Sequence, residues 1–267
     1  MADRTETQIS HVNPTFLTAY VKDDQSLHHL KEYRTVGRIS IIQSMHPSEM
    51  KAAYGEGSAI ILPDNVRLIK KEESFLFVPL FFCAEFIQWR ARDDKSGLAI
   101  VNRTYDATSV IASKARNADT MLETYHGGTP SKPWQYSFQE HLNFIGVVYG
   151  NKDMAPVAIS FSRGEFKTGK SFSSKIFGRK IPGTSDTAPL WAQVWSLGIE
   201  THKNKKGNEW WGFSIGNPEN PFIQPEEAES FRMFAEEFQK AYKENTMGVN
   251  MEGENMSTEE PVDNGSM

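Results

Sequence analysis

The chain has 267 residues, of which 24% are charged and 12% aromatic, and a net charge of −5. This length allows one large domain or two small ones with a sizeable core. The longest apolar run, residues 75–84, is far too short to cross a bilayer and contains Pro79. The polar N-terminus MADRTETQIS lacks the apolar segment of a signal peptide, and Cys83 is the sole cysteine. We therefore expect a cytoplasmic protein without internal disulfides.

The negative charge is concentrated at the C-terminal end. Residues 244–267 hold six acids and no lysine or arginine, and without them the chain has 28 acids and 29 bases. The same residues lack an apolar pattern, so we expect an acidic, disordered tail. A nearly neutral body can still bind nucleic acid through a local basic surface.

The sequence predicts a β-rich domain, 35–243, preceded by a polar N-terminal extension, 1–34. One or two helical turns are expected at 48–54, and residues 93–140 read as an insertion or a set of connections. Strands are expected where β-branched and aromatic residues cluster between turn residues: 36–43, 59–62, 66–69, 73–90 with Pro79 at an edge or bulge, 141–149 and 156–162.

The end of the apolar run 73–90 combines an aromatic side chain with guanidinium groups. Trp89, Arg90 and Arg92 would suit a second stacking site for bases. The alternative, which we favour for Trp89, is an indole that covers the edge of the core.

Residues 161–180, here called the basic stretch, are the main candidate for a nucleic-acid site. Phosphates are neutralised by cationic side chains, and aromatic faces stack on unpaired bases. The alternative, of equal weight, is a solvated hairpin whose phenylalanines enter a core. The candidate contacts are Arg163, Phe166, Lys167, Lys170, Phe172, Lys175, Arg179 and Lys180; Phe177 also lies in the stretch, and Glu165 is its one acid.

Within the basic stretch, Gly164 to Ser171 fits G-x-x-x-x-G-K-[ST], the phosphate loop of nucleotide hydrolases. That loop needs small residues, a following helix and a downstream acid for Mg²⁺. Gly178 and Pro182 shorten any following helix, and the loop positions include Phe166. We therefore interpret the match as coincidental.

The second half predicts a hairpin and a helix. Residues 189–201 alternate as in a strand, 202–208 form a basic tip, and 210–215 return. Candidate contacts at this tip are Lys203, Lys205, Lys206 and Trp210. Residues 225–243 place a proline at the start and aromatic side chains at helical spacing, which predicts a helix that packs on the sheet.

Neither a metal site nor a catalytic centre is expected. The pairs His28-His29 and Glu140-His141 lack partners at metal-binding spacing, and no Ser/His/Asp or Cys/His arrangement is evident. We expect no cofactor and no enzymatic activity. The fold class expected is mainly β with one C-terminal helix (α+β), arranged as an OB-like barrel with insertions.

Four segments resemble a group of phage-encoded early proteins similar to phage single-stranded-DNA-binding proteins. They read VGRISIIQSMHPSE, YGEGSAIILPDN, FLFVPLFFCAEFIQW and PLWAQVWSLGIETHKNKKGNEWWGFSIG. The acidic tail resembles those of phage helix-destabilising and bacterial single-stranded-DNA-binding proteins. This resemblance implies an OB-fold that coats single strands in the host cell during phage replication or recombination. The tail would recruit replication or recombination proteins, or compete with DNA for the basic groove. Bacterial tails end in an aromatic, whereas this one ends Asp263-Asn-Gly-Ser-Met267.

Two other functions stay open from the sequence: a nucleotide-binding enzyme that uses Gly164 to Ser171, and a phage protein-interaction component. The oligomeric state, the size of the DNA site and the preference for DNA over RNA are also open, and a homo-oligomer is compatible with the chain.

Overall fold

The computed structural model describes residues 35–97, 99–151, 155–244 and 248–249. The chain divides into two units, residues 1–34 and 35–267, and all described residues belong to the second. The predicted N-terminal extension and most of the predicted acidic tail therefore lie outside the described residues.

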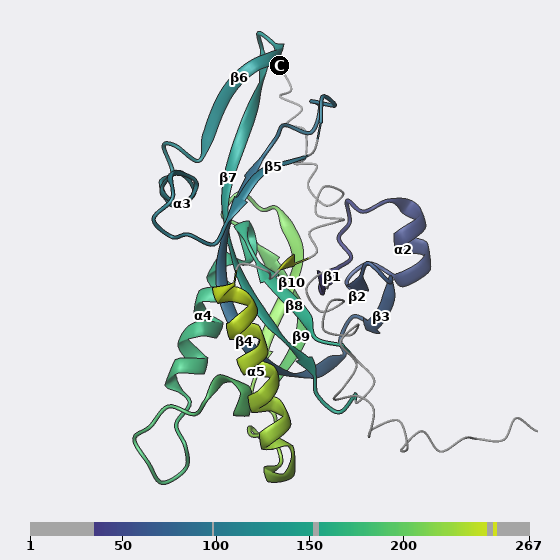
Figure 1. Cartoon of the computed structure of the whole chain (residues 1–267). Helices are drawn as coiled ribbons and strands as arrows, with labels where there is room; N and C mark the ends of the chain where they lie inside the picture. The colour runs from purple at the N-terminus through teal and green to yellow at the C-terminus, as the bar shows by residue number, and fades with distance from the viewer. Residues whose placement is uncertain (1–34, 98, 152–154, 245–247, 250–267) are drawn as a thin grey trace, which may run out of the picture. The chain divides into compact units, whose positions relative to one another are not determined.

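The described chain alternates strands with a few short helices (Figure 1). Helices are α2 (Ser48–Tyr54), α3 (Val110–Arg116), α4 (Phe166–Gly178) and α5 (Ala228–Lys243), and 3-10 turns are η2 (Arg163–Glu165), η3 (Leu190–Ala192) and η4 (Pro225–Glu227). Strands are β1 (Thr35–Ile41), β2 (Ala59–Leu62), β3 (Val66–Ile69), β4 (Ser74–Trp89), β5 (Ile100–Thr104), β6 (Leu122–Thr129), β7 (Lys132–Val148), β8 (Val157–Phe161), β9 (Trp195–Lys203), β10 (Glu209–Gly216) and β11 (Gly248–Val249).

The strands form one mixed sheet in the order β10-β9-β4-β7-β8-β1-β2-β3, with β5, β6 and β11 paired to β4, β7 and β1. The central pair, β4 and β7, is antiparallel over most of both strands. Its register shifts between Pro79 and Phe81, which confirms the predicted bulge at the proline. β6 and the first half of β7 form a long hairpin that projects from the rest of the sheet (Figure 1).

Helices cover both faces of the sheet. Side chains alternate along β4, and the bulge at Pro79 reverses this alternation. Phe77, before the bulge, therefore lies in the larger core with Phe144 and Phe161, whereas Cys83, after it, lies on the other face with Ile145. α4 buries Phe172 in the larger core. α5 packs Phe238 and Tyr242 on the opposite face, as predicted for the helix at 225–243.

The sheet curls so that its two ends meet. The side-chain amide of Gln43, just after β1, donates to the carbonyl of Trp211 (2.7 Å) and accepts from its N–H (2.9 Å). The Trp211 indole donates to Glu56 (3.1 Å), and Lys71 Nζ lies 4.8 Å from its ring centre. A Gln side chain thus occupies the exposed edge of β10, where another strand would otherwise pair.

The predicted mainly β, α+β architecture with a C-terminal helix is confirmed. The OB-like barrel is not: among the described residues the backbone pairing leaves an open path from β10 to β3, and side chains bridge its ends.

Three segments differ from the sequence prediction. Residues 93–140, expected as connections, contain β5, α3, β6 and the start of β7. The basic stretch contains helix α4. Gly248–Val249, expected in the disordered tail, pairs in parallel with the first two residues of β1. In each case long-range packing outweighs weak local preference.

Candidate nucleic-acid interface

Helix α4 turns the basic stretch into a two-sided element. Phe172 is fully buried, and Gly169 lies so close to the sheet that a Cβ there would stand 2.6 Å from the Cβ of Phe161. The glycine therefore lets the helix approach β8. The other side of α4 and the residues after it carry exposed lysines, and these are Lys167, Lys170, Lys175 and Lys180.

The one acid of the basic stretch points away from this exposed side. Glu165 accepts hydrogen bonds from Trp210 Nε1 (2.9 Å) and from the backbone N–H of Phe213 (3.0 Å). Its side chain is only 18% exposed. Gly212 makes room for it, because a Cβ there would lie 2.2 Å from the carboxylate. Glu165 thus fastens the start of α4 to β10, and the exposed charge of α4 is basic.

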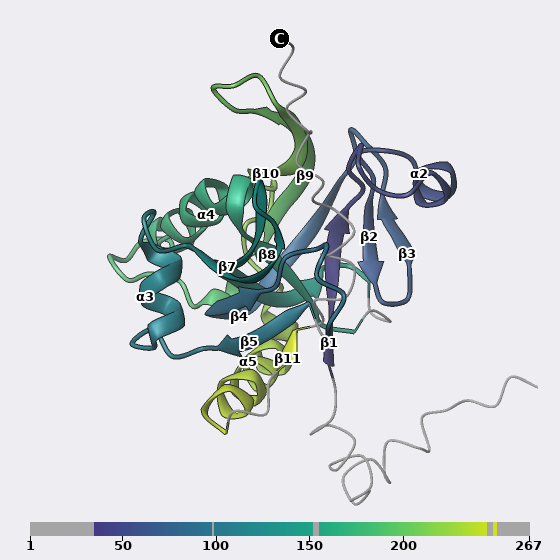
Figure 2. The same ribbon diagram turned by 90° about the horizontal axis from the view of Figure 1, so that it is seen from above.

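The β9–β10 hairpin extends this surface (Figure 2). At its base the His202 and Trp210 rings stack with centres 5.7 Å apart. At its tip Asn204 accepts the N–H groups of Lys206 and Asn208, which fixes the turn. Lys203 pairs with Glu209 (3.1 Å), and Lys205 and Lys206 are exposed. Glu165 and Trp210 therefore join α4 to the base of the hairpin that carries the basic tip.

Several predicted contacts have other roles. Phe172 packs in the core and cannot stack on a base. Arg179 donates to the carbonyls of Val194 (2.6 Å) and Pro221 (3.0 Å), and burial lowers its pKa to about 10. It therefore joins the end of α4 to the sheet. Lys175 likewise donates to the Ile215 carbonyl (2.7 Å).

Other predicted contacts are half-buried or paired within the surface. Phe166 packs against the larger core, with Lys170 Nζ 4.7 Å from its ring centre. Lys180 donates to the Thr187 hydroxyl (2.9 Å). Arg163 is exposed with a φ of 46°, a strained value for a residue with a side chain.

Trp89, Arg90 and Arg92 lie elsewhere. Trp89 is 7% exposed and belongs to the smaller core, in agreement with the alternative that we favoured. Arg90 donates to Ser96 (2.7 Å) and lies 3.7 Å from Asp94, and Arg92 is exposed in the same loop. This loop follows the end of β4 that is remote from the β9 pairing, up to about 50 Å along an extended strand. It is not part of the α4 surface.

Three phenylalanines outside the predicted contacts are exposed. Phe177 in α4 is 76% exposed, Phe234 in α5 is 43% exposed, and Phe82 in β4 is 39% exposed. Helical spacing puts Phe166, Lys170 and Phe177 on one stripe of α4, so Phe177 could have been found if the helix had been expected. Nothing in the apolar pattern around Phe82 distinguishes it from its buried neighbours.

The nucleotide-loop match at Gly164 to Ser171 has no loop geometry. The helix begins at Phe166, so Gly169, Lys170 and Ser171 lie within its first two turns. Backbone N–H groups inside a helix bond to carbonyls four residues earlier and cannot wrap a phosphate.

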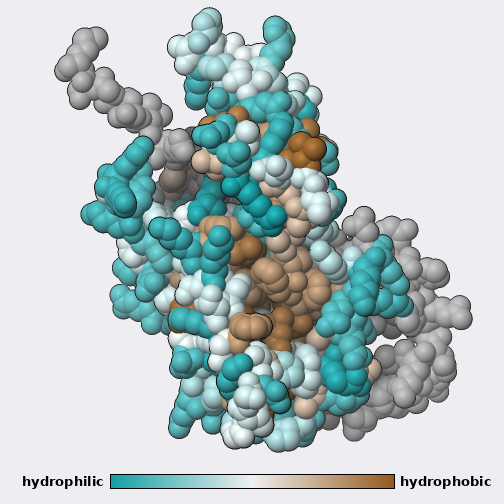
Figure 3. Space-filling model, turned by 90° about the vertical axis from the view of Figure 1, so that its left-hand side faces the viewer, coloured by the Kyte–Doolittle hydropathy of each residue, from teal (hydrophilic) through white to brown (hydrophobic). Residues whose placement is uncertain are grey.

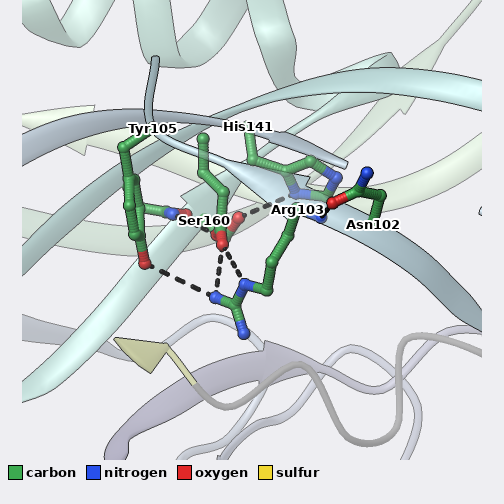
Figure 4. A network of polar contacts seen from close by, with 7 residues as sticks. Asn102, Arg103, Tyr105, His141 and Ser160 are labelled. Carbon is green, nitrogen blue, oxygen red and sulfur yellow. Dashed lines mark hydrogen bonds and ion pairs between the residues drawn. The ribbon is translucent and has the colours of Figure 1, made fainter. Parts of the chain in front are cut away.

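A second polar cluster lies on the opposite face of the sheet (Figure 4). The fully buried Glu85 accepts from Arg103 Nε (2.6 Å) and from Asn143 (3.0 Å), and His141 contacts Ser160 (3.2 Å). Burial raises the pKa of the adjacent Cys83 thiol to about 12. The thiol stays protonated, so Cys83 does not act as a thiolate nucleophile, and the carboxylate of Glu85 is paired.

Within the described ranges, no three His, Cys, Asp or Glu side chains gather as metal ligands, and no helix is long and apolar enough to cross a membrane.

Comparison with protein families identifies a match. No curated protein and no solved structure matches the chain. The model of the family described as Pam3 phage gp34-like protein matches residues 10–248, which include every described strand and helix except the last residue of β11. The chain therefore belongs to this family of phage proteins.

Proposed function

We propose that this phage protein binds single-stranded DNA without catalysing a reaction, in the host cytoplasm, during replication or recombination. The observation that carries the proposal is the surface formed by α4 and the β9–β10 hairpin. It turns the lysines outward while the only acid of the basic stretch points inward to β10.

The chemistry of this surface suits a flexible polyanion. Lys167, Lys170, Lys205 and Lys206 are exposed and can release counterions from phosphates. The stacked His202–Trp210 pair lies between the two groups of lysines and offers a half-buried aromatic edge. Unpaired bases can reach such a ring, whereas the bases of a duplex are already stacked.

The acidic residues 252–263 supply a competing polyanion or a contact for replication and recombination proteins. Either role requires a chain that can reach other surfaces, as the composition predicts. A homo-oligomer is compatible with this function.

A fluorescence titration tests the proposal, since six tryptophans provide the signal. We expect poly(dT) to bind more tightly than duplex DNA, without metal or nucleotide. If the four exposed lysines contact phosphates, log K should fall with log salt at a slope of about −3. Lys167→Ala and Lys205→Ala should each reduce that slope by about 0.7, and the exposed Lys243→Ala in α5 should not. Salt-independent affinity would refute the proposal.

The alternative of a nucleotide-binding enzyme has its own test. We expect no ATP hydrolysis, and only modest weakening of DNA binding by Lys170→Ala. Hydrolysis that Lys170→Ala abolishes would favour the alternative.

A further inference from the structure

Phe82 is an exposed aromatic on the face of β4 that carries the larger core. Its side chain is 39% exposed, whereas Phe86, four residues along the same face of β4, is fully buried. The Phe82 ring contacts Phe144 of β7 with centres 4.9 Å apart, and Phe144 contacts Phe172 of α4 at 4.6 Å. Phe82 therefore lies at the open margin of the aromatic core that α4 covers.

Two helices leave this part of the sheet open. On α3, Arg116 lies 4.6 Å from the ring centre of Phe86, and Lys114 lies 4.7 Å from that of Phe138. α4 covers Phe144. Figure 3, which views the side that carries these two helices, shows an apolar hollow framed by hydrophilic side chains. The cationic side chains of α3 thus cover the neighbouring rings of Phe86 and Phe138. Among the described residues, no cationic side chain is placed over the ring of Phe82.

The helix beside this margin presents both groups that a single strand needs. Lys167 and Lys170 are exposed on α4, and Phe177 is 76% exposed on the same stripe as Lys170. Apolar rings stack on bases, and lysines placed beside them hold the phosphates. An apolar peptide segment would cover the rings but leave the lysines of α4 without anionic partners, so the charge favours nucleic acid.

We propose that bases of the bound single strand stack on the exposed Phe82, with the phosphates on the α4 lysines. This inference rests on the proposed function and identifies where the bases lie. Phe82 takes the stacking role that the sequence assigned to the buried Phe172. Part of the affinity should therefore depend on bases rather than on phosphates.

The test compares oligo(dT) with an abasic deoxyribose-phosphate oligomer of equal length, by fluorescence anisotropy at several salt concentrations. Phe82→Ala is the variant, and Phe82→Leu removes the aromatic face while it keeps most of the apolar volume. The matched control is Phe234→Ala, which removes a phenylalanine of similar exposure (43%) from α5, on the opposite face of the sheet. Far-ultraviolet circular dichroism and the melting temperature verify folding of each variant.

We expect the wild type to prefer oligo(dT), and both Phe82 variants to weaken oligo(dT) binding about tenfold with an unchanged salt slope and unchanged abasic binding. Phe234→Ala should behave as the wild type. An unchanged ratio of oligo(dT) to abasic affinity in both Phe82 variants overturns this inference and leaves DNA binding standing. A wild type that binds neither oligomer overturns the proposed function itself.

Discussion

The change in DNA affinity on removal of Glu165 should have opposite signs for a purely electrostatic role and for a structural role of this residue. As one acid among six bases, it would be expected to oppose DNA binding, and its removal would tighten the complex. In the fold it instead joins α4 to β10 through Trp210 Nε1 and the Phe213 N–H. We therefore expect Glu165→Ala to destabilise the protein and to weaken DNA binding, because α4 and the hairpin lose their connection.

The size of the effect follows from the contacts. Two N–H groups lose a charged acceptor, and each such loss costs about 1–3 kcal/mol when the group stays buried. Because the Glu165 side chain is 18% exposed, water can replace part of the loss, which gives about 3 kcal/mol in total. Glu165→Gln keeps one acceptor oxygen and should lose about half as much.

Urea unfolding, followed by tryptophan fluorescence and by circular dichroism, measures this difference. Glu219→Ala is the control, since it removes the same charge from an exposed residue in the loop after β10. An unfolding free energy of Glu165→Ala within about 0.5 kcal/mol of that control would refute the structural role of Glu165. Tighter DNA binding by Glu165→Ala with unchanged stability would refute it as well.

Three further predictions concern other parts of the chain. Removal of residues 251–267, which spares β11 at 248–249, should preserve stability and tighten DNA binding. The gain in affinity should be largest at low salt, where the acidic tail competes best. Equal dissociation constants of the truncated and full chains at every salt concentration would exclude this competition. Burial lowers the pKa of His46 below 6.5, so the unfolded state binds more protons than the folded state as the pH falls. The stability that His46 contributes should be complete above pH 6.5 and should fall as the pH drops through that value. Unfolding free energies at about pH 7.5 and 5.5 should therefore differ less in His46→Asn than in the wild type. The buried Cys83 thiol, whose pKa is raised to about 12, should resist Ellman's reagent until urea unfolds the protein, and rapid reaction of the native form would contradict its burial.

The local pattern was sufficient for elements whose period is clear. Ala59–Leu62 and Val66–Ile69 have the predicted bounds, and the C-terminal helix was expected from its proline and its aromatic spacing. The local pattern was insufficient for residues 93–140, which give no steady period of polar and apolar residues. The β6–β7 hairpin projects from the rest of the sheet, so most side chains of β6 stay exposed. Gly248–Val249 is too short for any periodic signal, and its pairing depends on β1, more than 200 residues earlier.

The candidate site divides in the same way. The sequence by itself determined that lysines and aromatics are concentrated in two segments, 161–180 and 202–210, and that the opposing acids lie at the C-terminal end. Only the tertiary structure decided which side chains are available. Glu165 turns inward because β10 provides two N–H donors, Phe172 is buried because Gly169 lets α4 approach β8, and Phe82 is exposed because α3 and α4 stop short of it. These outcomes depend on packing between different strands and helices, and a local pattern carries no information about such contacts.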